Sequence, residues 1–266
     1  MKLDVQGRAA YAYTGGKAWS DDGPCVVFIH GALNDHSVWT LLARWYAHHG
    51  YRVLALDQPG HGRSDGPPLA SIEALADWLL ALLDAANLTS AHLVGHSMGS
   101  LIALEAASRA PERAAGLVMV GTAYPMKVSD ALLSTARDDP SRAIAMVNAL
   151  SHSSLASKPS YPGPGAWLRG GGSALMHRIQ SDADGNLFEH DFRVCDAYAG
   201  GIEAAGRVTC SSHLIVGTRD VMTPAKATKE LAGVLDATVA RIVSGHALMQ
   251  EAPDAVLNAM RAAIPA

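Results

Sequence analysis

The sequence feature that most constrains the fold is Gly95-His96-Ser97-Met98-Gly99, which joins an apolar segment to a helix-forming one. Residues 91–94 are mostly apolar and predict a short buried strand, whereas residues 101–107 favour a helix. A serine at such a sharp corner needs very small neighbours two positions before and after it, because larger side chains would collide with the crossing strand and helix. The two glycines meet this requirement. We therefore predict a strand, a tight corner that exposes the Ser97 hydroxyl above the sheet, and a helix.

Strand-like and helix-like segments alternate along most of the chain. Continuous apolar runs predict central strands that are buried on both faces, and segments with helical spacing separate them. The expected strands are residues 25–29, 52–56, 91–94, 115–120, 213–217 and 239–243, and the expected helices are residues 37–49, 71–86, 101–109, 225–234 and 253–263. Residues 5–13, followed by Gly15-Gly16, predict an opening strand and hairpin. This order predicts an α/β fold with a mostly parallel, doubly wound sheet and helices on both faces.

The alternation of strands and helices stops after Gly121 and resumes near residue 207. The intervening segment contains helical pieces and a section rich in Ser, Pro and Gly at residues 151–172. The helical pieces are residues 131–137, 142–150, 174–179 and 187–198. We therefore predict a core built from residues 1–121 and 207–266, with residues 122–206 inserted as a helical cap.

Composition argues against several classes of partner. The 21 basic and 25 acidic residues give a formal net charge of -4 without a basic cluster suited to phosphates, so nucleic acid is not an expected partner. No apolar run is long enough to cross a membrane, and residues 1–13 lack the apolar core of a signal peptide. The scattered Cys25, Cys195 and Cys210 predict neither a disulfide framework nor a metal site. These features together predict a cytoplasmic protein without a membrane partner.

A serine hydroxyl becomes a useful nucleophile only when a base lies within hydrogen-bonding reach. The most plausible base among the 12 histidines is His246, which follows the last expected strand and therefore lies at the same edge of the sheet as Ser97. Gly245 allows the loop to turn the imidazole inward. His96, although adjacent to the serine, is interpreted as a packing residue.

The imidazole in turn needs a carboxylate that orients it. Asp220 is the best candidate, because it lies in the loop directly after the expected strand at 213–217. Asp57 also follows a strand, but it precedes the serine and lies in a turn-rich loop, so we predict that it hydrogen-bonds loop amides. Asp138 and Asp139, in the expected cap, are more distant alternatives.

Two backbone N–H groups are expected to stabilise a negatively charged oxygen near Ser97. One belongs to Met98, at the start of the helix, where free N–H groups point outward. The other is the Ala32 amide in His30-Gly31-Ala32-Leu33, the loop after the expected strand at 25–29. Two such donors together supply several kcal/mol of transition-state stabilisation.

Methionines near loops suggest an apolar binding pocket for an acyl or aromatic group. The methionines concerned are Met126, Met146, Met176, Met222 and Met249. Of these, Met126 and Met222 are the predicted substrate contacts, together with Leu33.

The chain order Ser97, Asp220, His246, with the motifs G-H-S-M-G, H-G-A-L and D-Q-P-G-H-G-R-S, resembles the α/β-hydrolase fold superfamily. The resemblance implies an α/β-hydrolase core, a cap that covers the active site, and a structural role for residues 57–64. Relatives with haloalkane-dehalogenase or epoxide-hydrolase chemistry have an aspartate at the position of Ser97, so the serine argues against both activities.

The leading hypothesis is a serine hydrolase that acts on a small or medium carboxylic ester and needs no metal or organic cofactor. The same three residues also serve C–C bond hydrolysis, lactone opening, thioester cleavage and perhydrolysis, which the sequence does not separate. A ligand-binding receptor that keeps the fold and turns over slowly is the alternative from another class. The sequence leaves the substrate and the oligomeric state open.

Overall fold

The structure, a computed structural model, describes residues 1–153 and 167–265. Within these residues the chain forms one eight-stranded sheet with the order β1-β2-β4-β3-β5-β6-β7-β8. The strands are β1 (Lys2–Val5), β2 (Arg8–Tyr13), β3 (Cys25–Ile29), β4 (Arg52–Leu56), β5 (Ala91–His96), β6 (Ala114–Val120), β7 (Ser212–Gly217) and β8 (Thr238–Ile242). β1 pairs antiparallel with β2, and β2 with β4, whereas all later pairs are parallel. The predicted mostly parallel sheet is therefore confirmed.

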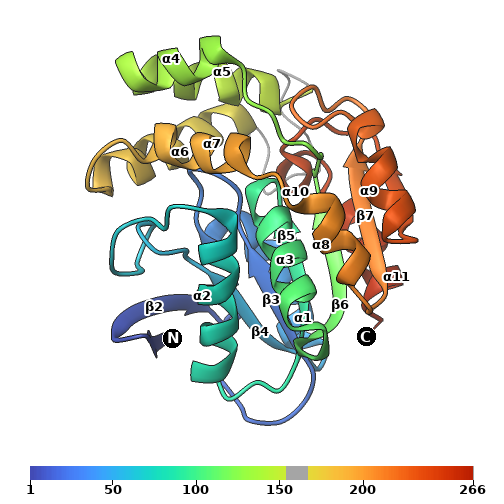
Figure 1. The fold of residues 1–266 in the computed structure, drawn as a ribbon. Helices are drawn as coiled ribbons and strands as arrows, with labels where there is room; N and C mark the ends of the chain where they lie inside the picture. The colour runs from blue at the N-terminus through green and yellow to red at the C-terminus, as the bar shows by residue number, and fades with distance from the viewer. Residues whose placement is uncertain (154–166, 266) are drawn as a thin grey trace.

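Helices cover both faces of the sheet, and a further group lies beyond one end of it (Figure 1). α2, α3 and α8 share one buried cluster with the sheet, while α1 and α11 pack on the opposite face. α4, α5, α6 and α7 form the group at the top of Figure 1. The helices are α1 (Thr40–His48), α2 (Ile72–Ala85), α3 (Met98–Arg109), α4 (Asp130–Asp138), α5 (Pro140–Ser151), α6 (Leu168–Asp182), α7 (Leu187–Ala197), α8 (Gly201–Arg207), α9 (Lys229–Val234), α10 (Leu248–Glu251) and α11 (Pro253–Ala263).

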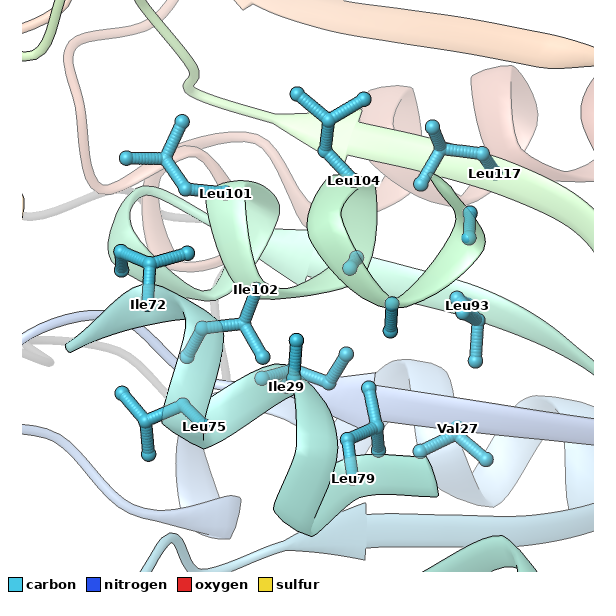
Figure 2. Close-up of a cluster of buried hydrophobic side chains, with 14 of the residues drawn as sticks. Val27, Ile29, Ile72, Leu75, Leu79, Leu93, Leu101, Ile102, Leu104 and Leu117 are labelled. Carbon is cyan, nitrogen blue, oxygen red and sulfur yellow. The ribbon is translucent and has the colours of Figure 1, made fainter. Parts of the chain in front are cut away.

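The main core lies between the central strands and the helices α2 and α3. Every residue of β3 is buried, as the continuous apolar run predicts. Figure 2 shows Val27 of β3 beside Leu79 of α2, with Ile102 of α3 on the same side of the sheet. Each fully buried aliphatic side chain of this kind contributes about 1.5–3 kcal/mol, so this layer holds β3 and β5 firmly against α2 and α3.

The four helices at the end of the sheet have a hydrophobic cluster of their own. It contains Ile144 and Val147 of α5 and Phe188 of α7, and the fully buried Leu33 reaches it from the loop after β3. This group lies within the predicted cap segment, residues 122–206. α8 also falls within that segment, but it packs with α3.

Two local predictions were wrong at the N-terminus and in the cap. The hairpin turn lies at Gln6-Gly7, where both residues have positive φ, rather than at Gly15-Gly16. α6 begins at Leu168, six residues before the expected helical piece, because it continues through three successive glycines. Residues 154–166, part of the section rich in Ser, Pro and Gly, lie outside the described residues.

No helix in the described residues is both long enough and apolar enough to span a membrane.

Candidate active site

The corner between β5 and α3 has the geometry that its glycines predict. Ser97 has φ 51° and ψ −120°, a strained conformation for a residue with a side chain. A Cβ atom on Gly95 would lie 2.1 Å from the Gly99 carbonyl oxygen, and one on Gly99 would lie 2.3 Å from the Ile29 carbonyl oxygen. The close crossing of strand and helix therefore requires both glycines, and it holds Ser97 at the end of the sheet.

His246 and Asp220 are joined by a hydrogen bond. They come from the loops after β8 and β7, and His246 Nδ1 lies 2.8 Å from Asp220 Oδ2. Because Nδ1–H donates to the carboxylate, the Nε2 atom of a neutral imidazole is left with its lone pair. Both side chains are buried, so water competes little for this bond.

The Asp220 carboxylate also accepts hydrogen bonds from its own loop. The backbone N–H groups of Met222 and Thr223 donate to Oδ1, and the Thr223 hydroxyl donates to Oδ2. Burial alone would raise the pKa of Asp220, but His246 and the Thr223 bonds outweigh it and hold that pKa below its ordinary value. Asp220 is therefore ionised, as an orienting carboxylate must be. Thr223, which lies 3.0 Å from His246 Nδ1, was not predicted as part of the site.

Ser97 and His246 both border one cavity of about 180 Å³. Among the described residues nothing hydrogen-bonds to the Ser97 hydroxyl, so the structure brings the serine and the imidazole to the same cavity without joining them. The wall is mostly apolar and includes the predicted contacts Met126 and Met222. Leu132, Val147 and Met176 extend it into the helices at the end of the sheet.

The two predicted oxyanion donors lie beside the serine. Ala32 borders the cavity, and a Cβ atom on the preceding Gly31 would lie 3.1 Å from Ser97 Cβ, so this loop approaches the serine closely. Met98 is the first residue of α3, and an N–H group at that position has no partner within its helix. Both residues therefore lie close to Ser97, and their role as oxyanion donors stays a prediction.

The predicted substrate contact of Leu33 is wrong. Its side chain is fully buried in the hydrophobic cluster of α4 to α7, and it is not among the described residues that border the cavity. Leu33 has φ 51°, an uncommon backbone conformation for a residue with a side chain. Its N–H group is also occupied, because it donates to Asp191 Oδ2 at 2.8 Å.

Asp191 of α7 is a buried link between the cap helices and the core loops. Its Oδ2 atom accepts from the Leu33 N–H and lies 2.9 Å from His61 Nε2, in the loop after β4. Burial lowers the pKa of His61, but the Asp191 charge outweighs that effect, so the net pKa of His61 is raised. His61 Nδ1 faces the Pro59 carbonyl oxygen, so a protonated ring has an acceptor at each nitrogen.

His96 has a packing role, as predicted, and a second one. Burial lowers its pKa to about 3, so the ring is neutral, and its Nε2–H donates to the His246 carbonyl oxygen at 3.0 Å. The ring therefore supports the loop that carries His246 while it borders the cavity.

Asp57 acts as the predicted structural carboxylate. It accepts hydrogen bonds from the backbone N–H groups of His36 and Arg63 and from the His36 ring. Burial would raise the pKa of Asp57, but His36 outweighs that effect and the pKa is lowered. With Asp35 and His36 it also forms a compact cluster of potential metal ligands. These atoms are engaged in hydrogen bonds that a metal would have to replace.

Asn148 of α5 and His152, which directly follows that helix, border the cavity and were not predicted as site residues. Asn148 lies one turn after Ile144 and directly after Val147, on the buried face of the helix. A polar residue on an otherwise apolar helix face is the signal that could have revealed it.

Comparison with known proteins identifies the family. The family model described as alpha/beta hydrolase fold matches residues 24–160, just over half of the chain. The protein therefore belongs to the α/β-hydrolase family.

Individual relatives are similar over shorter stretches. A dihydrolipoyllysine-residue acetyltransferase component of an acetoin cleaving system from Pseudomonas putida is 36% identical over 124 residues, which cover 46% of this chain and 32% of that protein. A pimeloyl-[acyl-carrier protein] methyl ester esterase from Methylococcus capsulatus is 39% identical over 105 residues, 38% of each chain. The chain spans about a third of the length of the curated relatives that it matches.

Solved structures match over the whole chain. An enol-lactonase from Burkholderia xenovorans LB400 superposes with a TM-score of 0.82 at 20% identity and covers 100% of both chains. An esterase from Exiguobacterium antarcticum gives a TM-score of 0.82 at 16% identity, covering 98% of this chain and 97% of that one. At these identities the likeness establishes the fold.

Proposed function

We propose that the protein is a serine hydrolase that cleaves a small or medium carboxylic ester through an acyl-enzyme intermediate. The observation that supports this most directly is the convergence on one cavity of a strained serine and a carboxylate-bonded imidazole. A mostly apolar wall suits an acyl or aromatic group. The ester-cleaving and lactone-cleaving proteins among the similar structures are consistent with this chemistry.

In the proposed reaction His246 Nε2 removes the hydroxyl proton of Ser97 as its oxygen attacks the ester carbonyl carbon. The ester oxygen becomes negatively charged in the tetrahedral intermediate and accepts hydrogen bonds from the Ala32 and Met98 amides. His246 then gives the proton to the leaving alcohol, and the C–O bond breaks. Asp220 stabilises the imidazolium in between.

Water completes the proposed cycle. His246 removes a proton from a water molecule that attacks the acyl-enzyme, and the Ser97 oxygen leaves with that proton, which releases the acid. General-base catalysis contributes about 10²–10⁴-fold, and each oxyanion donor about 10²–10³-fold.

Covalent labelling tests the nucleophile. A fluorophosphonate probe is expected to label the wild-type protein and to fail on Ser97→Ala, whereas Ser129→Ala, which changes another serine at the same cavity, keeps the label. Absence of labelling in folded wild-type protein would refute the hydrolase proposal and favour the receptor alternative.

Turnover tests the substrate class. We expect p-nitrophenyl esters of increasing acyl length to be cleaved, with an optimum at short to medium length, and kcat of Ser97→Ala to fall by about 10⁴-fold or more. Lactones, a thioester and a C–C hydrolase substrate are assayed in parallel. A higher kcat/KM for one of these would replace the ester proposal while leaving the nucleophile in place.

A further inference from the structure

A carboxylate of the cap segment reaches the loop that carries a predicted oxyanion donor. Asp191 of α7 accepts a hydrogen bond from the Leu33 N–H, which lies 2.8 Å from its Oδ2 atom. Leu33 directly follows Ala32, whose amide is the proposed donor, so the bond acts on the neighbouring peptide group. Asp191 is 2% exposed and Leu33 is fully buried, so water competes little for this bond.

The bond holds a turn in a conformation that leucine disfavours. Ala32 and Leu33 are the central residues of this turn, and Leu33 has φ 51°. A positive φ at the second central position favours glycine or asparagine, and rotation of the central peptide group would restore a negative φ. The same rotation changes ψ of Ala32. Because the Leu33 N–H belongs to this peptide group, its bond to Asp191 opposes the rotation.

The other hydrogen bonds that hold this turn come from the core. Asn34 Nδ2 donates to the Ala32 carbonyl oxygen at 2.9 Å, at the opposite end of the same peptide group. His30 Nε2 accepts from a backbone N–H after β4, so Nδ1–H donates to the Gly31 carbonyl oxygen at 2.8 Å. Because a peptide group is planar, that bond also restrains the Ala32 N–H. The cap segment adds its restraint through Asp191.

The accepting oxygen of Asp191 is itself fixed by the core. His61, in the loop after β4, has its Nε2 atom 2.9 Å from the same Oδ2 atom and is 2% exposed. A buried carboxylate is tolerated where it is paired and hydrogen-bonded. The oxygen that faces the Leu33 N–H is therefore held in place from two sides, by α7 and by the loop after β4.

We propose that Asp191 is a positioning residue for ester cleavage, which holds the turn so that the Ala32 amide stays aimed at the oxygen that becomes negatively charged. An oxyanion donor acts only when its N–H reaches the position of that oxygen, so its aim decides its effect. Asp191 is not among the described residues that border the cavity, and it acts through Leu33 and Ala32. This inference rests on the hydrolase function proposed above.

Two double variants isolate the acceptor. Asp191→Leu alone would leave His61 buried without its partner, whereas replacing both members of a buried pair by apolar residues is often neutral or stabilising. We therefore compare Asp191→Leu/His61→Leu, which has no acceptor for the Leu33 N–H, with Asp191→Asn/His61→Leu, which keeps an oxygen acceptor. The two proteins differ only at residue 191.

Kinetics of p-nitrophenyl butyrate cleavage give the first readout. We expect kcat of the Leu/Leu protein to fall by at least about tenfold, because loss of one oxyanion donor costs about 10²–10³-fold. KM should change little, since the hole acts on the transition state. The Asn/Leu protein should recover most of the wild-type kcat. Equal kcat in the two variants would overturn the proposal.

A transition-state analogue gives a readout that a merely structural role would not move. When an alkyl trifluoromethyl ketone binds, Ser97 Oγ adds to its carbonyl carbon, the hydroxyl proton passes to His246, and the carbonyl oxygen becomes an oxyanion. Its Ki should rise in the Leu/Leu protein by the factor by which kcat/KM falls, whereas the Ki of the product butyrate should stay constant. An unchanged Ki for the ketone would overturn the positioning role.

A second buried hydrogen bond controls for general loosening of the fold. The Tyr198 hydroxyl, directly after α7, donates to Glu105 Oε2 at 2.7 Å, and Tyr198 is not among the described residues that border the cavity. Tyr198→Phe should lower Tm and leave kcat and the Ki of the ketone unchanged. A fall in kcat as large as that of the Leu/Leu protein would assign the effect to stability and overturn the proposal.

Failure of the positioning role and failure of the hydrolase proposal give different results. If the wild-type protein takes the fluorophosphonate label at Ser97 and cleaves the ester, but the two double variants do not differ, only the role of Asp191 is overturned. If folded wild-type protein neither takes the label nor cleaves any ester, the hydrolase proposal fails, and the positioning role fails with it.

Discussion

The buried Asp191 carboxylate leads to a quantitative prediction for stability. Its Oδ2 atom accepts from the Leu33 N–H and from His61 Nε2–H, and Asp191 and His61 are each 2% exposed. Breaking a buried charged pair by removing one partner costs about 3–5 kcal/mol, because the other group stays buried and unpaired. We expect Asp191→Leu to lose about this amount of unfolding free energy. Asp191→Asn keeps an oxygen acceptor and should lose about 1–3 kcal/mol.

The pH dependence of this loss has a definite sign. In the wild-type protein the pKa of His61 is raised above 6.5, so its contribution is fully present below that value and is lost as the pH rises through the folded pKa. In Asp191→Asn the raising charge is gone and burial lowers the pKa of His61, so stability falls as the medium becomes acidic. The stability difference between the two proteins should therefore be larger at acid pH.

Urea unfolding followed by tryptophan fluorescence measures this difference at about pH 5.5 and about pH 8, on either side of the ordinary histidine pKa. Burial lowers the pKa of His96 in both proteins, so its effect cancels in the difference. His30, whose ring centroid lies 5.0 Å from that of His61, has its pKa lowered by burial to about 4 and stays neutral. A difference in unfolding free energy between wild type and Asp191→Asn that is independent of pH, or larger at alkaline pH, would refute the ion pair between His61 and Asp191.

Three further predictions concern the corner, a helix cap and the histidine loop. Gly95→Ala should prevent correct folding, because its Cβ atom would lie 2.1 Å from the Gly99 carbonyl oxygen. The control Gly206→Ala, in open space on α8, should leave Tm unchanged or raise it. Soluble yield and Tm of the two variants test this difference. Ser71→Ala removes the N-cap of α2 and should cost about 1 kcal/mol in urea unfolding; no loss would contradict the capping role. Glu251→Gln replaces a buried carboxylate that accepts from the Gly245 N–H, so kcat should fall by about tenfold with little change in KM, and Tm should fall as well because the charged acceptor is lost; an unchanged kcat would contradict this positioning.

The central fold was predictable because its signals are local. Continuous apolar runs marked β3 and β4 to within a residue, and paired glycines around Ser97 marked the corner. Parallel strands bring their carboxyl ends to one edge, so a residue directly after β7 and one after β8 could be expected to lie together. The hydrogen bond between Asp220 and His246 agrees with that expectation.

The cap was less predictable because its structure depends on packing between distant segments. Helix propensity places the start of α6 after Gly172, yet burial of Leu168 and Met176 extends the helix through the glycines. The hydrogen bond from the Leu33 N–H to Asp191 joins residues 158 positions apart, and no local sequence pattern predicts it. Leu33, which the sequence placed at the substrate, instead makes this bond and is buried in the hydrophobic cluster of α4 to α7.

The order in which β8 and its loop follow β5 matters for synthesis on the ribosome. A nascent chain carries the strained serine and its glycine corner long before the imidazole of His246 has been translated. Under the proposed roles, the nucleophile gains its base only when β8 docks on β7 and completes that edge of the sheet. Under these roles, pairing of the last strand completes the catalytic residues, and a chain that lacks β8 does not form an acyl-enzyme.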